Sequence, residues 1–133
     1  MKYTITKSQY GKIILNYLNN IASDFIFEER HRENDNYVNV TTSNGDNFGA
    51  IWYGGAITEG CTEELSLDLG FMSEIEDVIP IIIPKLFSEV VLEYFNSKTG
   101  SECDCLEFTY AAGEYDQWGD PFNSTYHYNT KKQ

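Results

Sequence analysis

Apolar residues near the start of the chain recur at the spacing of a helix. Between Ile13 and Ile21 they stand three and four residues apart, which places them on one helical face. The preceding Thr6-x-x-Gln9 has the form of a capping box, in which each side chain accepts a hydrogen bond from the other residue's backbone N–H. Together these features predict a first helix from about Lys7 to Ala22.

Three strands are predicted in the following segment. Residues 25–32 and 37–42 are rich in β-branched and aromatic side chains, as is the run from Phe48 to Tyr53. Asn44-Gly45 separates the second run from the third, and this dipeptide is a strong hairpin signal because both residues tolerate a positive φ. The second and third strands are therefore expected to pair.

A fourth strand is predicted between residues 65 and 71. Four apolar side chains alternate there with polar residues or glycine, the pattern of a strand with one face on the core, and they are Leu65, Leu67, Leu69 and Phe71. Ser73-x-x-Glu76 is a second capping-box candidate, which predicts a short helical turn that Pro80 would limit.

The second half of the chain contains the longest predicted helix. Residues 84–98 trace an amphipathic face, and Gly100 follows as a stop signal. Residues 106–110 alternate as a further strand, and residues 112–121 form a turn-rich loop in this interpretation. A last extended stretch covers residues 122–128.

This order of elements predicts an α+β fold. The strands form an antiparallel sheet of about five strands, and two main helices pack on one of its faces. A chain of 133 residues has the length of one domain and buries roughly two-thirds of the unfolded chain's surface. No repeat, low-complexity tract or linker divides it, so residues 1–133 are expected to form a single domain with the last few residues frayed.

Acidic residues are distributed unevenly along the chain. The formal net charge is -12, and residues 33–130 hold 18 of the 21 acidic side chains but only Lys85 and Lys98 as basic ones. So acidic a chain repels phosphates, which excludes nucleic-acid binding driven by charge. The acids form either a solvated face or a surface that docks on a basic partner, and the second alternative includes mimicry of nucleic acid.

The predicted turn-rich loop combines carboxylates, aromatic side chains and loop formers, a composition found at interfaces. We expect it to present Trp118, flanked by Asp116 and Asp120, to a protein, sugar or nucleobase. Phe122 and Tyr126 extend this candidate partner-binding site. In the alternative interpretation, Trp118 and Phe122 fold back and cover the sheet.

The three cysteines are expected to be reduced thiols in a cytoplasm. Cys103 and Cys105 stand two residues apart, a spacing that seldom suits a disulfide between them, and with Cys61 they lack the ligand spacing of a zinc site. If the strand at 106–110 faces the core with its apolar residues, both thiols point the other way. No calcium-loop spacing and no phosphate-binding loop with its lysine occurs, so no metal, cofactor or catalytic residue is expected.

Neither export nor membrane insertion is expected. The opening residues lack the uninterrupted apolar stretch of a signal peptide. The longest apolar run, residues 78–83, is far shorter than the roughly 20 residues that cross a bilayer. These features predict a cytoplasmic location.

Two segments resemble small uncharacterised proteins of tailed bacteriophages. The opening Ile5-Thr6-x-Ser8-Gln9-Tyr10 leads directly into a helix, with Lys7 where those proteins often have Glu. Val91-Leu92-Glu93-Tyr94-Phe95-Asn96, before a glycine-containing turn, is similar to their second helix. The resemblance implies a viral accessory protein that acts in a bacterial cytoplasm, and it implies no activity or functional residue.

Two functional hypotheses follow from these observations. The acidic body, the missing catalytic motifs and the phage-like segments favour a non-enzymatic accessory protein. It would bind and modulate a host protein with a basic surface, such as a defence factor or a nuclease. The alternative is a protein that binds or sequesters a nucleotide or sugar, enclosed by the aromatic loop and Gly54-Gly55, with Arg30 and Arg32 at the pocket.

Overall fold

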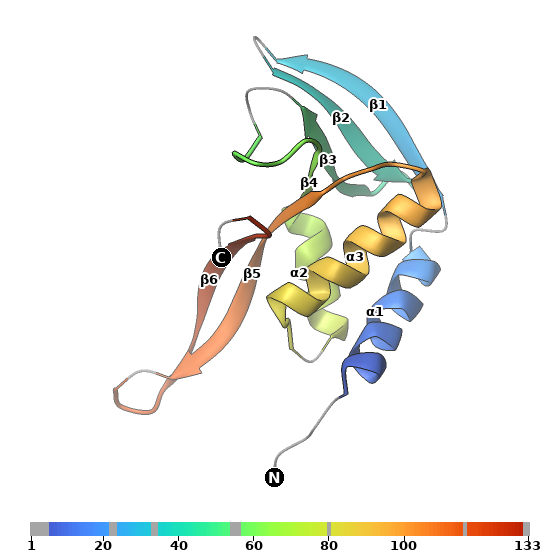
Figure 1. Ribbon diagram of the computed structural model, residues 1–133. Helices are drawn as coiled ribbons and strands as arrows, with labels where there is room; N and C mark the ends of the chain where they lie inside the picture. The colour runs from blue at the N-terminus through green and yellow to red at the C-terminus, as the bar shows by residue number, and fades with distance from the viewer. Residues whose placement is uncertain are drawn as a thin grey trace.

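The computed structural model describes residues 6–21, 24–32, 35–53, 57–79, 81–115 and 117–131. These residues form an α+β structure in which three helices lie on one side of a six-stranded sheet (Figure 1). In chain order the elements are α1 (Lys7–Ile21), β1 (Phe25–Arg32), β2 (Asp35–Thr42), β3 (Asn47–Tyr53), β4 (Glu64–Leu67), α2 (Leu69–Val78), α3 (Pro84–Thr99), β5 (Cys105–Tyr115) and β6 (Pro121–Asn129). None of the described helices combines the length and apolar character needed to cross a bilayer.

The elements with local sequence signals lie where they are predicted. The capping box at the start of α1 is formed: the Gln9 N–H donates to Thr6 Oγ1 at 3.1 Å, and the Thr6 N–H donates to Gln9 Oε1 at 3.0 Å. β2 and β3 pair antiparallel around a turn in which Gly45 has a φ of +89°. α3 ends at Gly100, whose φ of +73° lets its N–H bond the Asn96 carbonyl.

The predicted fourth strand is wrong in its second half. β4 is only four residues long, and Leu69 and Phe71 belong to α2 instead. Asp68 explains the change, because its carboxylate accepts hydrogen bonds from the N–H groups of Gly70 and Phe71 and so caps a helix. The predicted capping box at Ser73 is also wrong, since that residue lies inside α2.

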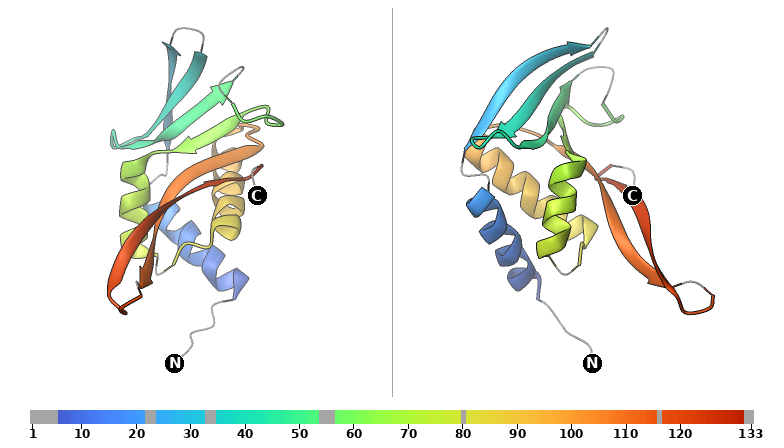
Figure 2. Two further views of the ribbon diagram at one scale, coloured as in Figure 1. Left: turned by 90° about the vertical axis from the view of Figure 1, so that its left-hand side faces the viewer. Right: turned by 180° about the vertical axis from the view of Figure 1, so that it is seen from behind.

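The sheet is mixed and has six strands, whereas the sequence predicts an antiparallel sheet of about five. The strands follow one another in chain order, and every neighbouring pair is antiparallel except β4–β5, which is parallel. Parallel neighbours need a long crossover, and α2 and α3 together provide it. α2 is a full helix where the sequence predicts only a short helical turn, and Figure 1 and Figure 2 show it on the same side of the sheet as α1 and α3.

The C-terminal hairpin is longer than predicted. β5 continues to Tyr115 and β6 begins at Pro121, so half of the predicted loop at 112–121 is strand. Ala111, Ala112 and Gly113 have low strand propensity, and their pairing with β6 overrides it.

The core lies between the helices and the inward face of the sheet. Its largest fully buried aromatic side chains are Tyr10, Phe48, Phe87, Phe95 and Phe108. The Tyr10 hydroxyl donates to the Ile81 carbonyl at 3.0 Å and accepts from the Ile83 N–H at 2.8 Å. These bonds tie α1 to the segment between α2 and α3, and burial raises the pKa of Tyr10 above its ordinary value.

The prediction of three reduced thiols is wrong for two of them. Cys61 and Cys105 form a disulfide across 44 residues of sequence, and Cys103 is a free, buried thiol. The fold brings the pair together because Cys61 precedes β4 and Cys105 begins the neighbouring β5. Cys103 was expected on the same face as Cys105, but it precedes the strand and packs in the hydrophobic core.

Candidate partner-binding arm

β5 and β6 form an antiparallel arm that projects from the body of the molecule (Figure 1). Their pairing runs from Glu107 and Asn129 at the root to Tyr115 and Pro121 at the tip, and this paired segment with its turn is called the arm below. Figure 2 shows the arm extending past the layer of helices. Side chains in the turn at 117–120 are therefore held away from the core.

An aromatic ladder on the inward face anchors the root of the arm. The Phe108 ring packs edge-on against Phe87 of α3, with centroids 5.0 Å apart, and lies 5.3 Å from the ring of Tyr128. Farther along the arm, the rings of Tyr110 and Tyr126 are 5.8 Å apart. The exposed fraction rises from 2% for Phe108 through 8% for Tyr128 to 38% for Tyr126, so the arm leaves the core gradually.

The tip of the arm exposes a tryptophan. Trp118 is 76% exposed, the largest fraction of any large apolar side chain in the described residues. Gln117 and Asp120 are exposed beside it, and Gly119 has a φ of +83° that lets the chain turn back. Trp118 therefore does not cover the sheet, which was the alternative considered for it.

The structure brings three of the five predicted partner-binding side chains onto the arm. Trp118 and Asp120 lie at the tip, and Tyr126 lies on the inward face of β6. Phe122 belongs to β6, but its side chain is outside what the structure describes. Asp116 lies outside the described residues altogether.

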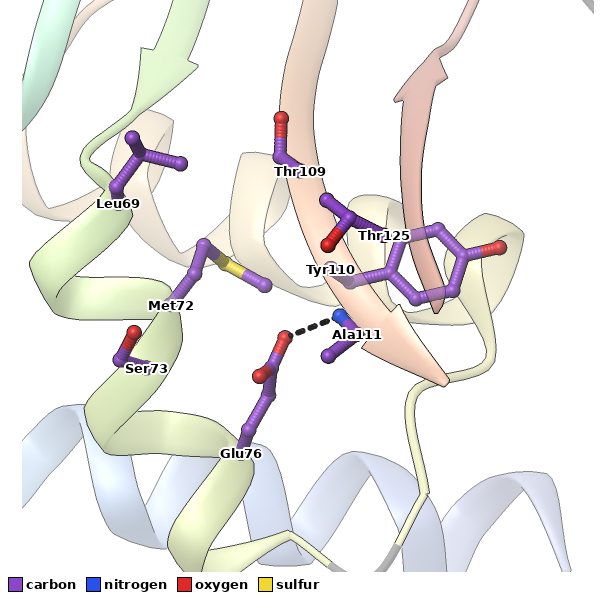
Figure 3. A pocket seen from close by; sticks show the side chains of 8 residues that line it. All are labelled: Leu69, Met72, Ser73, Glu76, Thr109, Tyr110, Ala111 and Thr125. Carbon is purple, nitrogen blue, oxygen red and sulfur yellow. Dashed lines mark hydrogen bonds between the residues drawn. The ribbon is translucent and has the colours of Figure 1, made fainter. Parts of the chain in front are cut away.

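α2 braces β5 on the edge away from β6. The Ala111 N–H donates to Glu76 Oε1 at 2.9 Å, and Figure 3 shows the carboxylate directed at the strand. β4 has already ended at this height, so the carboxylate takes the place of a neighbouring strand's carbonyl. A hollow of about 260 Å³ lies between α2 and β5, with Met72 directed into it. Glu76 was assigned to a capping box from the sequence, which contains no signal for this distant contact.

A hydrogen-bonded cluster holds the root on the outer face of the sheet, opposite the helices. The buried Glu64 carboxylate accepts hydrogen bonds from both the N–H and the hydroxyl of Thr58 at 3.1 Å. The Asn129 side chain donates to the same hydroxyl at 2.9 Å. The Cys61–Cys105 disulfide joins the same segment covalently to the start of β5. The segment before β4 is thereby fastened to both strands of the arm.

Asp104 adds a second attachment next to the disulfide. Its Oδ1 atom accepts hydrogen bonds from the N–H groups of Thr62 and Glu63, both at 3.0 Å. Burial acts to raise the pKa of Asp104, but the backbone hydrogen bonds from Glu63 and Thr62 outweigh it and hold this pKa below its ordinary value. The carboxylate therefore stays charged and keeps the segment in place at neutral pH.

The sequence of the arm is acidic. Residues 105–130 include four acidic side chains and neither lysine nor arginine. On the outer face, His127 Nε2 lies 3.3 Å from Glu107 Oε2. An exposed indole beside an aspartate, on an arm without basic residues other than one histidine, complements a basic protein surface.

The structure describes only some of the features proposed for a nucleotide or sugar site. Arg30 is exposed and forms an ion pair with Glu28 at 3.2 Å. The side chain of Arg32 and the Gly54-Gly55 pair lie outside the described residues. A second hollow, of about 270 Å³, lies over β3 and β4, and the described residues that line the two hollows include no lysine or arginine.

Cys103 is not set up as a nucleophile. Burial, together with the nearby Glu63 and Asp104 carboxylates, raises the pKa of its thiol to about 12. The thiol is therefore protonated at neutral pH, and the thiolate is the reactive form. Within the described ranges, no three side chains of the His, Cys, Asp and Glu types gather in a way that could hold a metal ion.

No protein-family model, curated protein or solved structure matches the chain. The candidate site is therefore defined by its geometry. It consists of an exposed indole and an aspartate at the end of an acidic arm, whose root is fixed by the aromatic ladder, the disulfide and Glu76.

Proposed function

We propose that this chain is a non-enzymatic accessory protein that binds a partner protein through the tip of its arm. The observation that carries the proposal is the 76% exposure of Trp118 on a hairpin with a fixed root. Tryptophan is among the side chains most enriched at the energetic centre of protein interfaces. Because the root is already ordered, less conformational freedom is lost when the tip binds.

The partner's contact surface is basic in this proposal. Asp120 stands beside Trp118, and the whole chain has a net charge of -12. Complementary charge raises the association rate and selects the orientation of approach. The phage-like segments favour a host protein as the partner, such as a defence factor or a nuclease.

The disulfide bears on the compartment in which the chain acts. The cytoplasmic location expected from the sequence rested partly on reduced thiols. The Cys61–Cys105 disulfide removes that support, because disulfides persist mainly in oxidising compartments.

The proposal is tested by capturing partners from a bacterial lysate on the immobilised chain and then measuring affinities for the purified partner. Trp118→Ala is expected to weaken binding by about 30-fold or more, because truncating an interface tryptophan typically costs about 2 kcal/mol or more. Asp120→Asn is expected to slow association, with an effect that shrinks as salt screens the charge.

Ile26→Ala is the matched control. It truncates an apolar side chain that is 52% exposed on β1, at the opposite edge of the sheet. Its affinity should equal that of the unmodified chain. Equal affinities for Trp118→Ala and the unmodified chain would contradict binding through the tip.

A further inference from the structure

We infer that the partner contributes an extended segment with alternating apolar and basic residues, which pairs as a seventh strand along the outer edge of β6. This inference rests on the proposed function and specifies how the arm binds. β6 is the last strand in the sheet order, so within the described part of the chain one of its edges has no neighbouring strand. An added strand would need backbone N–H and C=O groups of β6 that point toward this edge.

The register of β5 and β6 determines which backbone groups of β6 point outward. In an antiparallel ladder, residue pairs alternate between those that exchange hydrogen bonds and those whose N–H and C=O groups point away from each other. The Ala111 N–H points to Glu76 and away from β6, so the Ala111–Thr125 pair is of the second kind. Thr125 and, two residues on, His127 therefore direct their backbone N–H and C=O groups outward.

A hydrogen bond at the root of the arm gives the same alternation of pairs. The Thr130 N–H donates to the Leu106 carbonyl at 3.1 Å, so this pair exchanges a hydrogen bond across the ladder. Because hydrogen-bonded pairs recur at every second residue, the pairs of Phe108 and Tyr110 with β6 are also hydrogen-bonded. In the alternate pairs, the backbone N–H and C=O groups of β6 point outward. Two independent contacts thus assign the outward groups of β6.

This edge lacks the protection that the other edges have. Exposed sheet edges are commonly guarded by charged side chains, and β1 at the opposite edge includes Glu28, Glu29 and Arg30. Beyond β4, the free edge of β5 is braced by Glu76. The sequence of β6 contains no Lys, Arg, Asp or Glu between Pro121 and Asn129. β6 is therefore the edge on which a further strand meets the fewest obstacles.

Side-chain alternation and charge define the occupant. An added strand places alternate residues beside Tyr126 and Tyr128 on the inward face, where apolar side chains fit. Its other residues lie on the face of His127, between Asp120 at the tip and Glu107 at the root, where basic side chains fit. A second copy of this chain would bring together two molecules with a net charge of -12 each, so another protein is the favoured occupant.

The test uses a capped seven-residue peptide in which lysine and valine alternate. A peptide with the four lysines and three valines in two blocks has the same charge but no alternation, and it serves as the ligand control. Binding is followed through the amide resonances of the ¹⁵N-labelled chain. The alternating peptide should shift and protect the amides of Thr125 and His127, and the block peptide should bind about tenfold more weakly or not at all.

Two variants of one residue separate strand pairing from adhesion by charge. Thr125→Pro removes an outward N–H but no bond between β5 and β6, and proline is tolerated on the solvent side of an edge strand. It should weaken binding of the alternating peptide about tenfold or more, because the pairing bonds at this position are lost. Thr125→Val keeps the N–H and should bind within about twofold of the unmodified chain.

Peptides methylated on alternate nitrogens give the same test without altering the protein. Methylation on the edge that faces β6 should abolish binding, and methylation on the other edge should leave it intact. Equal binding of both methylated peptides, or equal binding to Thr125→Pro and Thr125→Val, would overturn strand pairing. Self-association of the unmodified chain that Thr125→Pro removes would show that a second copy fills the edge, and would overturn the proposed occupant.

The two proposals fail in different ways. If Trp118→Ala abolishes capture of the lysate partner and Thr125→Pro does not, the tip binds the partner and strand pairing is wrong. If the alternating peptide pairs with β6 but Trp118→Ala leaves partner capture unchanged, the edge accepts a strand and the role of the tip is wrong.

Discussion

The Glu76 carboxylate of α2 accepts a hydrogen bond from the Ala111 backbone N–H across 35 residues of sequence. The contact lies just beyond the end of β4, where β5 loses its parallel neighbour. The Glu76 side chain thus accepts the hydrogen bond of a backbone N–H on the edge of β5, where a neighbouring strand would otherwise provide the acceptor. We expect this contact to limit the movement of the arm relative to the helices.

Removing this contact should loosen the arm. Glu76→Ala is expected to lower the free energy of unfolding by about 1 kcal/mol, the usual net value of one hydrogen bond, and to speed amide exchange at Ala111. Urea denaturation and hydrogen exchange measure the two effects. Glu76→Gln keeps an oxygen acceptor and should behave like the unmodified chain. If Glu76→Ala changes neither quantity, the contact does not hold the arm.

The disulfide should contribute more stability than any other single feature of the arm. Cys61 and Cys105 are 44 residues apart, and the chain-entropy relation for a loop of this length gives about 4 kcal/mol. The double substitution of both residues by alanine is expected to lower the free energy of unfolding by about that amount. Adding a reductant to the unmodified chain should have a similar effect, whereas it should not affect the double variant. An unchanged urea midpoint in reductant would show that the bond contributes little.

The start of α2 should depend on Asp68 and not on Ser73. Asp68→Ala removes the side chain that accepts from Gly70 and Phe71, which is expected to cost about 1 kcal/mol. Ser73→Ala alters an exposed position inside the helix and should change stability by less than about 0.5 kcal/mol. Thermal or urea unfolding of the two variants gives the comparison, and equal losses would contradict the assignment of the cap.

Stability should fall at alkaline pH in a way that depends on Cys103. Burial raises the pKa of its thiol from 9.0 to about 12 in the folded state. The folded state keeps this proton longer than the unfolded state, so the stabilisation is complete below about pH 9 and is lost as the pH rises through about 12.

Urea unfolding across this pH range should therefore show a shallower loss for Cys103→Ala than for the unmodified chain. A residual slope remains in the variant, because burial also raises the pKa values of Tyr10 and Tyr17. Identical slopes for the two chains would show that the Cys103 thiol does not titrate differently in the folded state.

The fold could be predicted where the signal is local. α1 begins at a capping box, α3 ends at Gly100, and the β2–β3 hairpin turns at Asn44-Gly45. The segment at 65–71 was predicted wrongly because its alternation of apolar residues suits a strand. Asp68 interrupts that strand by capping a helix, and Phe71 reaches the core from the helix instead.

Features that depend on distant residues could not be predicted in the same way. The parallel β4–β5 pairing requires the α2–α3 crossover, and the Cys61–Cys105 disulfide follows from that pairing. Composition singled out Trp118 and Asp120 as candidate contacts, but the arm that exposes them includes Gly113 and its alanine neighbours, whose strand propensity is low.

The aromatic side chains of the arm become more exposed with distance from the core, so the length of the arm can change with little effect on core packing. Residue pairs beyond Phe108 and Tyr128 add reach more than core packing. Removing two residues from each strand would keep the remaining side chains on their faces, because side chains alternate between the two faces with a period of two. The same change would bring the Trp118 indole about 7 Å closer to the body. In the proposed function, the arm is a spacer, and its number of paired residues sets how deep a recess in another protein the indole could enter.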